Sequence, residues 1–167
     1  GNGIAPDSLI VNDYYPEFVA ALSAEGLDLQ FAARTIGEIP ADITVGDYEI
    51  NEAIWNDFTD FLNDEEFTYE SISELRLRDL QELASDMDYL GAEDLNPILD
   101  NIKARKDHVL ESEKKAISEY LSDYLIQRKY SIPGALERGL HKDEVIARAA
   151  EIVLNPQPLS ELLSVTP

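Results

Sequence analysis

The chain has 167 residues, no cysteine, and a formal net charge of −21 that arises from 34 acidic and 13 basic residues. This length suits one domain, which can bury roughly 70% of the surface that its unfolded chain exposes. The lack of cysteine excludes disulfides, thiol catalysis and cysteine metal sites from these residues. The compartment stays open, because both cytosolic and exported proteins can lack cysteine.

The negative charge is concentrated in the first part of the chain. Residues 1–75 hold 17 acids and one cation, Arg34, for a net charge of −16, whereas residues 76–167 carry a net charge of −5. Such a chain repels phosphate groups, so we expect no binding to nucleic acid or to anionic membranes. Two interpretations of the acidic part remain: a solvated surface kept soluble by its charge, or a face for a basic partner.

We also expect no membrane insertion. No stretch of the sequence approaches the ~20 consecutive apolar residues that are needed to span a bilayer. The first ten residues lack the basic start and the apolar run of a signal peptide.

The first half of the chain alternates between extended segments and short helices. Residues 1–12 are interrupted by glycine and proline and read as extended chain. A helix is predicted from Pro16, which suits a first helical position, to Gly26, which suits a C-cap. A short helix or turn follows and ends near Gly37, and residues 38–50 read as loop and extended chain.

Asn51 is a good N-cap for the next helix, in which apolar residues recur at i, i+4, i+7 and i+8. These positions are Ile54, Phe58, Phe61 and Leu62. Phe67 and Tyr69 alternate in a short extended segment, and a further helix is predicted from Ser71 to Gly91.

From Asn96 onward the apolar residues keep one helical phase as far as Leu125. This continuity permits one helix of about 33 residues, roughly 50 Å long at 1.5 Å per residue. The alternative is a break near Ser112. A turn is predicted at residues 131–139, with the sequence SIPGALERG, and a last strong helix at residues 141–155. The sequence thus predicts an all-α helical bundle of about five to seven helices, with one long helix or helix pair and an extended N-terminal segment.

Few residues suggest chemistry. His108 and His141 are far apart in the sequence, and neither belongs to an HExxH pattern. The acidic stretches at residues 63–66 and 86–88 lack the spacing, central glycine and closing glutamate of a calcium loop. No glycine motif for a phosphate or dinucleotide is present. We therefore assign no catalytic, cofactor-binding or metal-binding residue, and no cofactor.

Ser112 and Lys115 match the S-x-x-K pattern of some serine acyl-enzymes. In those enzymes the lysine takes the serine proton within a dry cleft. Here both residues lie in a run of charges, where water keeps the lysine protonated, and the companion motifs S-D-N and K-T-G are missing. We interpret Ser112 as an ordinary helix serine.

The aromatic residues at helical spacing are interpreted first as core. A peptide-binding groove is the alternative for Tyr120, Tyr124 and Tyr130, which lie on the second half of the predicted long helix.

The opening heptapeptide GNGIAPD resembles the G-G-G-I-x-P-D signature near the end of the catalytic core of carboxy-terminal processing (tail-specific) serine peptidases. The matching residues are Gly1, Gly3, Ile4, Pro6 and Asp7. In a bacterial branch of that family a short helix with a Gly-Leu end follows, then an aromatic-Ala pair, which resembles EFVAALSAEGLDLQFA here.

The later segments follow the same family in order. A helix with phenylalanines three residues apart matches Phe58 and Phe61, and an extended F-x-Y segment matches Phe67 and Tyr69. A closing E-I-x-x-R-Y pattern is similar to YLIQRKY, which ends at Tyr130. The resemblance covers nearly the whole chain.

The resemblance implies that residues 1–12 are the remnant of an exit strand from a missing protease core and that residues 13–167 form one helical accessory domain. The family's Ser nucleophile, Lys base and PDZ domain lie upstream of such a segment, so no catalytic residue is carried over. The implied partners are the protease core and PDZ domain of the parent chain, with a homo-oligomer as a further partner.

The parent is expected in the periplasm or cell envelope. A domain made to cover a protease core should also expose an apolar face when it is alone. The rival hypothesis is a free-standing acidic helical module that binds a basic partner, and an independent enzyme is the least favoured.

Overall fold

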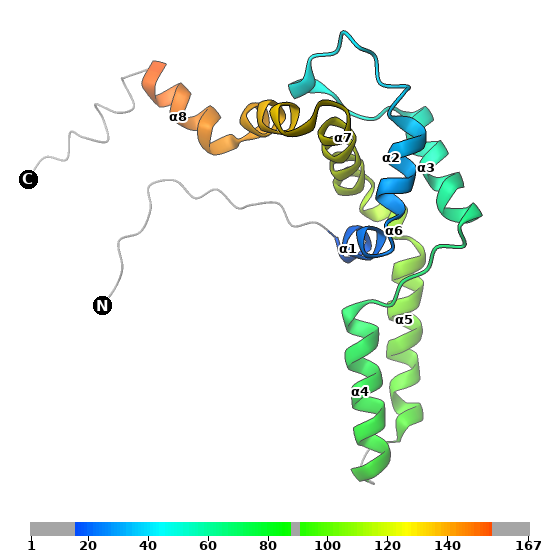
Figure 1. Ribbon diagram of the computed structural model, residues 1–167. Helices are drawn as coiled ribbons and strands as arrows, with labels where there is room; N and C mark the ends of the chain where they lie inside the picture. Colours follow the sequence, from blue (N-terminus) through cyan, green and yellow to red (C-terminus); the bar gives the residue numbers. More distant parts are fainter. Residues whose placement is uncertain (1–15, 88–90, 155–167) are drawn as a thin grey trace, which may run out of the picture.

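The computed structural model describes residues 16–87 and 91–154 (Figure 1). These residues form eight α-helices and two short 3₁₀ helices and contain no strand. The predicted all-α bundle is confirmed, with eight helices instead of the expected five to seven. The extended segment expected at residues 1–12 lies outside the described residues.

The bounds of the α-helices are α1 Glu17–Ala24, α2 Leu27–Thr35, α3 Glu52–Asp64, α4 Ile72–Met87, α5 Asn96–Asp107, α6 Val109–Ser112, α7 Lys114–Lys142 and α8 Glu144–Leu154. The 3₁₀ helices are η1 Val45–Asp47 and η2 Ala92–Leu95. No helix within the described ranges is both long enough and apolar enough to cross a membrane.

The first three helices begin and end where the sequence predicts. Pro16 precedes α1, and Gly26, with a φ of 70°, separates α1 from α2. That backbone conformation is readily available to glycine and strained for other residues. The Asn51 Oδ1 accepts a hydrogen bond from the Ile54 amide at 3.0 Å, which confirms Asn51 as the N-cap of α3.

The main core lies where α1, α2 and α3 pack on the first part of α7 (Figure 1). Phe58 lies at its centre, with ring centroids 5.1 Å from Phe31 and 6.5 Å from Phe18. Both pairs pack edge to face, the arrangement that the ring quadrupole favours. The residues of α7 that complete this core are Ile117 and Leu121, both buried. The predicted aromatic core is confirmed.

A second, smaller core joins the loop between α2 and α3 to the middle of α7. Ile39, Val45 and Tyr48 from this loop pack against Leu125 and Ile126 of α7. This packing attaches the loop to α7, because its apolar residues are buried by a helix distant in sequence.

The continuous helix that the periodicity permits does not form, and the alternative of a break near Ser112 is confirmed. His108 (φ −102°, ψ 11°) and Glu113 (φ −109°, ψ 14°) leave the helical conformation, so α5, α6 and α7 are three separate helices. Tertiary packing causes this break, because Val109 and Leu110 of the short α6 turn toward the main core.

The predicted turn at residues 131–139 is also wrong in its extent. One residue, Ser131 (φ 59°, ψ −156°), leaves the helical conformation, and the chain is helical again up to Lys142. Pro133 fits this arrangement because the first turn of a helix needs no amide donor from it. We call residues 114–130 and 132–142 the first and second segments of α7.

The second segment of α7 folds back toward the first. Lys142 Nζ donates to Glu119 Oε1 at 2.8 Å, whereas one straight helix would separate these residues by about 35 Å. Arg138 likewise donates to Asp123. Gly134 permits the close approach, since a Cβ at this position would lie 2.3 Å from the Cβ of Tyr130.

Helices α4 and α5 form a hairpin that projects away from the rest of the domain (Figure 1). A capping box starts α4: the Ser71 amide donates to Glu74 at 2.8 Å, and the Glu74 amide donates to the Ser71 hydroxyl at 3.2 Å. Lys106 of α5 then donates to both Glu74 oxygens, at 2.8 and 2.9 Å, and to the Tyr69 carbonyl at 2.6 Å. This cluster joins both helices of the hairpin to the body.

Candidate functional site

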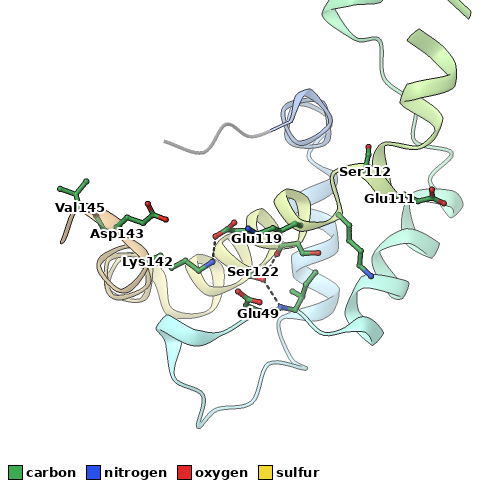
Figure 2. Close-up of a pocket in the computed structure, with 13 residues that line it drawn as sticks. Glu49, Glu111, Ser112, Glu119, Ser122, Lys142, Asp143 and Val145 are labelled. Carbon is green, nitrogen blue, oxygen red and sulfur yellow. Dashed lines mark hydrogen bonds and ion pairs between the residues drawn. The ribbon is translucent and has the colours of Figure 1, made fainter. Parts of the chain in front are cut away.

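A cavity of about 1020 Å³ runs along one side of α7 (Figure 2). Its lining comes from the segment before α3, from α6, from both segments of α7 and from the start of α8. The lining residues are Glu49, Ile50, Glu111, Ser112, Lys114, Lys115, Ser118, Glu119, Ser122, Lys142, Asp143, Glu144 and Val145. Charged side chains of both signs therefore dominate this groove.

Two of the three lysines in the groove are committed to ion pairs. Lys114 donates to both oxygens of Glu52 at 2.8 and 2.9 Å, and Lys142 donates to Glu119, which points toward it in Figure 2. The hydrogen bond from Lys142 lowers the pKa of the Glu119 carboxyl, against the opposing effect of its partial burial. The pair Lys142–Glu119 therefore joins the two segments of α7, and the pair Lys114–Glu52 joins α7 to α3.

Ser122 is the buried hydroxyl of the groove. It donates to the Ser118 carbonyl at 2.7 Å and accepts from the Ile50 amide at 3.0 Å. Both of these bonds are structural, because one satisfies a helix carbonyl and the other ties the segment before α3 to α7.

Ser112 and Lys115, the S-x-x-K pair of the sequence, both line the groove but are exposed to solvent. The Ser112 hydroxyl contacts the Val109 carbonyl at 3.5 Å, as a helix serine does. This geometry differs from the dry cleft that a lysine base requires.

The two histidines lie in different places. His108 is exposed at the break between α5 and α6, with its Nδ1 3.5 Å from Glu111. His141, near the end of α7, has its Nε2 2.8 Å from Asp47 of η1, and its ring packs so closely on Gly46 that a Cβ there would lie 2.5 Å from it. His141 therefore helps to hold η1 against α7.

The acidic stretches that the sequence singles out are helix ends. Residues 63–66 end α3, where Glu65 forms an exposed ion pair with Arg34 at 3.4 Å. Residues 86–88 run from the end of α4 into a gap in the described residues. Within the described part of the chain, no group of three or more metal-ligating side chains comes together.

Arg138, which no sequence pattern indicates, is 2% exposed and joins three elements. Its Nη1 contacts the carbonyls of Val45 and Gly46 at 3.3 and 3.4 Å and also that of Tyr48, while its Nε pairs with Asp123. A lone arginine in a helix of mixed charge gives no local signal, because its acceptors lie about 90 residues earlier in the chain.

The α4–α5 hairpin carries exposed apolar side chains. They are Ile72, Leu75, Leu80, Leu83 and Ile98, which we call the hairpin apolar face. Leu77 and Ala84, on the other side of α4, are buried. At 100° per residue, Ile72, Leu75 and Leu83 lie about 100–180° around the helix from Leu77 and Ala84, whereas Leu80 lies beside Ala84. The apolar residues of α4 therefore cover more of its surface than the domain buries.

The second segment of α7 and helix α8 carry another set of exposed apolar side chains. They are Ile132, Leu136, Leu140, Val145, Ile146, Val153 and Leu154, which we call the α7–α8 apolar surface. Helix α8 lies at the far end of the domain from α3 in Figure 1. Exposed apolar side chains therefore lie in two separate parts of the domain.

A family described as Probable PDZ-protease, C-terminal helical domain, matches residues 18–153. This chain belongs to that family. The match runs from α1 into α8, so the PDZ-protease helical domain includes the body, the hairpin and the α7–α8 apolar surface. The resemblance found in the sequence is confirmed at this level, whereas the GNGIAPD motif precedes the matched residues. No curated protein and no solved structure matches the chain significantly.

Proposed function

We propose that this PDZ-protease helical domain is a non-catalytic accessory domain of a carboxy-terminal processing serine peptidase. It packs on the protease core of its parent chain and contributes to substrate access or oligomerisation. The parent acts in the periplasm or cell envelope. The observation that carries the proposal is the hairpin apolar face, which is exposed on an element that projects from an otherwise well-packed body.

The pattern of α4 supports a docking role for this face. Leu75 and Leu77 lie on opposite sides of α4, and an exposed apolar side of a helix gains stability when a partner covers it. Leu77 is covered within the domain, and Leu75 and Leu83 are not. A protease core is the natural cover for the second side in a chain that belongs to a PDZ-protease family.

The anchoring of the hairpin supports the same role. Lys106, Glu74 and the Tyr69 carbonyl fix its base, and Glu17 of α1 accepts from the Ile72 amide at 3.2 Å. The apolar face is therefore presented in a set direction relative to the body, which lowers the entropic cost of docking.

The test uses the protease–PDZ part of the parent, with this domain supplied as a separate chain. We expect the domain to bind it and to alter its cleavage of unstructured peptides. The variant Leu75→Gln/Leu83→Gln should weaken binding at least tenfold, since two apolar anchors are lost. Leu29→Gln on α2 is the matched control, because Leu29 is similarly exposed but lies outside the hairpin.

Two results would contradict the proposal. One is equal binding by the hairpin variant and the Leu29→Gln control. The other is robust peptide hydrolysis by this domain alone that disappears in Ser112→Ala, since Ser112 and Lys115 would then be a working catalytic pair.

A further inference from the structure

Helix α8 has almost no packing partner among the described residues. All of its residues are exposed except Ile152, which is half-buried, and Val153 and Leu154 are 76% and 78% exposed. Asp143 caps the helix by accepting from the Val145 and Ile146 amides at 2.8 and 3.0 Å. An isolated helix shorter than about 12–15 residues is only marginally stable in water, and α8 has 11 residues. Its stability therefore calls for a covering surface.

The residues of α8 are separated cleanly into two faces. At 100° per residue, Glu144, Arg148 and Glu151 fall within about 60° of one another. Val145, Ala149 and Val153 follow one another at a spacing of four on the other side, with Ile146 beside them. This is the pattern of a helix that buries one face and solvates the other.

The apolar face of α8 is symmetric about its middle. Val145 lies four residues before Ala149, and Val153 lies four residues after it, so a valine occupies both positions. If a second α8 runs antiparallel about a twofold axis at Ala149, each Val145 meets the Val153 of the other copy. The small side chain of Ala149 lets the two helices approach closely at the axis. An isologous contact requires this self-complementarity.

The electrostatics of this region also permit a second copy. Residues 132–154 contain four acids and three lysines or arginines, a net charge of −1, against −21 for the whole chain. Helix α8 lies well away from the acidic α3 (Figure 1), and exposed charges are screened within about 8 Å at physiological salt. Two domains can therefore meet at α8 with their α3 helices apart.

We infer that α8 pairs antiparallel with α8 of a second copy of this chain, with Ala149 at the twofold axis. The second segment of α7 adds Ile132, Leu136 and Leu140 to the edge of the contact. This inference rests on the proposed function, of which it specifies the oligomerisation part: the hairpin apolar face meets the protease core, and the α7–α8 apolar surface meets another protomer.

The first test is the mass of the chain in solution, measured by sedimentation equilibrium over a concentration series. We expect a dimer that dissociates on dilution. Val145→Gln/Val153→Gln should raise the dissociation constant at least tenfold. Leu75→Gln/Leu83→Gln, which changes the hairpin apolar face equally, should leave it unchanged. A wild-type chain that stays monomeric overturns the inference, as does equal weakening by both double variants.

The second test uses disulfide formation to examine the antiparallel arrangement of the two α8 helices. Because the chain has no cysteine, an introduced cysteine can form a disulfide only with its counterpart in the other copy. Ala149→Cys should oxidise to a covalent dimer, since the two sulfurs meet near the axis within bonding reach. Arg148→Cys, one residue away on the charged face, should stay monomeric. Equal cross-linking of both variants overturns the antiparallel arrangement.

These outcomes are separable from the core-docking proposal. If the dimer is absent while hairpin variants still lose binding to the protease–PDZ part, only the α8 inference fails. If Val145→Gln/Val153→Gln loses that binding instead, the protease core covers α8, which again overturns the inference. If the dimer forms but hairpin variants bind normally, core docking through the hairpin fails.

Discussion

The body of the domain and its two projecting elements use the same kind of amphipathic helix in different ways. In the body, α3 buries Ile54, Phe58 and Phe61 against α1, α2 and α7. In the projections, α4 leaves Leu75 and Leu83 exposed, and α8 leaves Val145 and Val153 exposed. An apolar stripe therefore predicts that a helix needs a partner and does not specify that the partner belongs to the same domain.

This difference has a thermodynamic consequence. Side chains in the body should determine the stability of the isolated domain, and apolar side chains on the projections should affect association much more than stability.

Phe58→Ala should destabilise the domain most, by about 3–5 kcal/mol, because it removes a fully buried ring and leaves a cavity beside the aromatic rings of Phe18, Phe31 and Trp55. The measurement is the free energy of unfolding from a urea titration followed by circular dichroism. Leu83→Ala in the same assay is the control and should change it by less than about 0.5 kcal/mol. Similar losses of stability for the two variants would contradict the expectation that body side chains determine stability and side chains of the projections do not.

Arg138→Leu should cost about 2–4 kcal/mol, because the loop carbonyls that Arg138 contacts would lose their buried donor. Arg128→Leu, on the exposed side of the first segment of α7, should cost less than about 1 kcal/mol. Amide exchange offers a local readout, since the Arg138 variant should lose protection first around η1. Protection that is unchanged at η1 would show that Arg138 does not hold the loop.

Two glycines of the second α7 segment should respond to alanine with opposite signs. Gly134→Ala places a Cβ 2.3 Å from Tyr130 and should destabilise the domain by about 1–3 kcal/mol. Gly139→Ala meets no atom within 4 Å and should stabilise it by about 0.5–1 kcal/mol, as alanine does inside a helix. Thermal unfolding of the two variants side by side measures the difference, and a shared sign would exclude the folded-back arrangement of α7.

The base of the hairpin should be sensitive to acid. Burial raises the pKa of Glu74, but the hydrogen bonds from Lys106 and Ser71 outweigh it and lower this pKa below its ordinary value of 4.5. A lowered pKa means that the contribution of Glu74 to stability is present above pH 4.5 and is lost as the pH falls through the lowered pKa.

Glu74→Gln should therefore cost about 1–2 kcal/mol at neutral pH, since a hydrogen-bonded charge pair is lost, and much less at acidic pH. Unfolding curves recorded from pH 7 down to pH 3 test this. The exposed pair Arg76–Asp79 supplies the control, because Asp79→Asn should change stability little at any pH. A constant cost of Glu74→Gln across this range would exclude the ion pair as its source.

The smallest effect on stability should come from Leu75→Gln/Leu83→Gln. Both side chains are exposed, so we expect the unfolding free energy to change by less than about 0.5 kcal/mol while binding to the protease–PDZ part weakens at least tenfold. Thermal unfolding and binding are measured on the same preparation. A large loss of stability would show that the hairpin apolar face is needed by the domain itself.

Much of the body could be predicted from the sequence because its signals are local. The cap at Asn51, the separation of α1 from α2 at Gly26 and the stripe of α3 depend on residues within a few positions of one another. The long-range contacts gave no such signal. Arg138 and its loop acceptors are about 90 residues apart, and Tyr120 donates to Asp28 across 92 residues at 2.7 Å.

The charged groove also could not be predicted from residues that are close in the sequence. Ser112 and Lys115 were singled out as a pattern, but the groove around them is built by Glu49 before α3 and Lys142 at the end of α7. These residues meet because Ser131 reverses the chain, and one residue in a left-handed conformation gives no pattern of its own.

The amino-acid sequence was sufficient to establish an all-α domain, its strongest helices and its relation to a peptidase family, since periodicity, caps and ordered motifs are written in neighbouring residues. The tertiary structure alone established where α5 to α7 break, how α7 folds back and which apolar stripes remain exposed. These features depend on which helix faces pack against one another. That choice depends on all the apolar faces of the domain together, because the interior can bury only some of them. Helices α4 and α8 carry stripes that this interior did not cover.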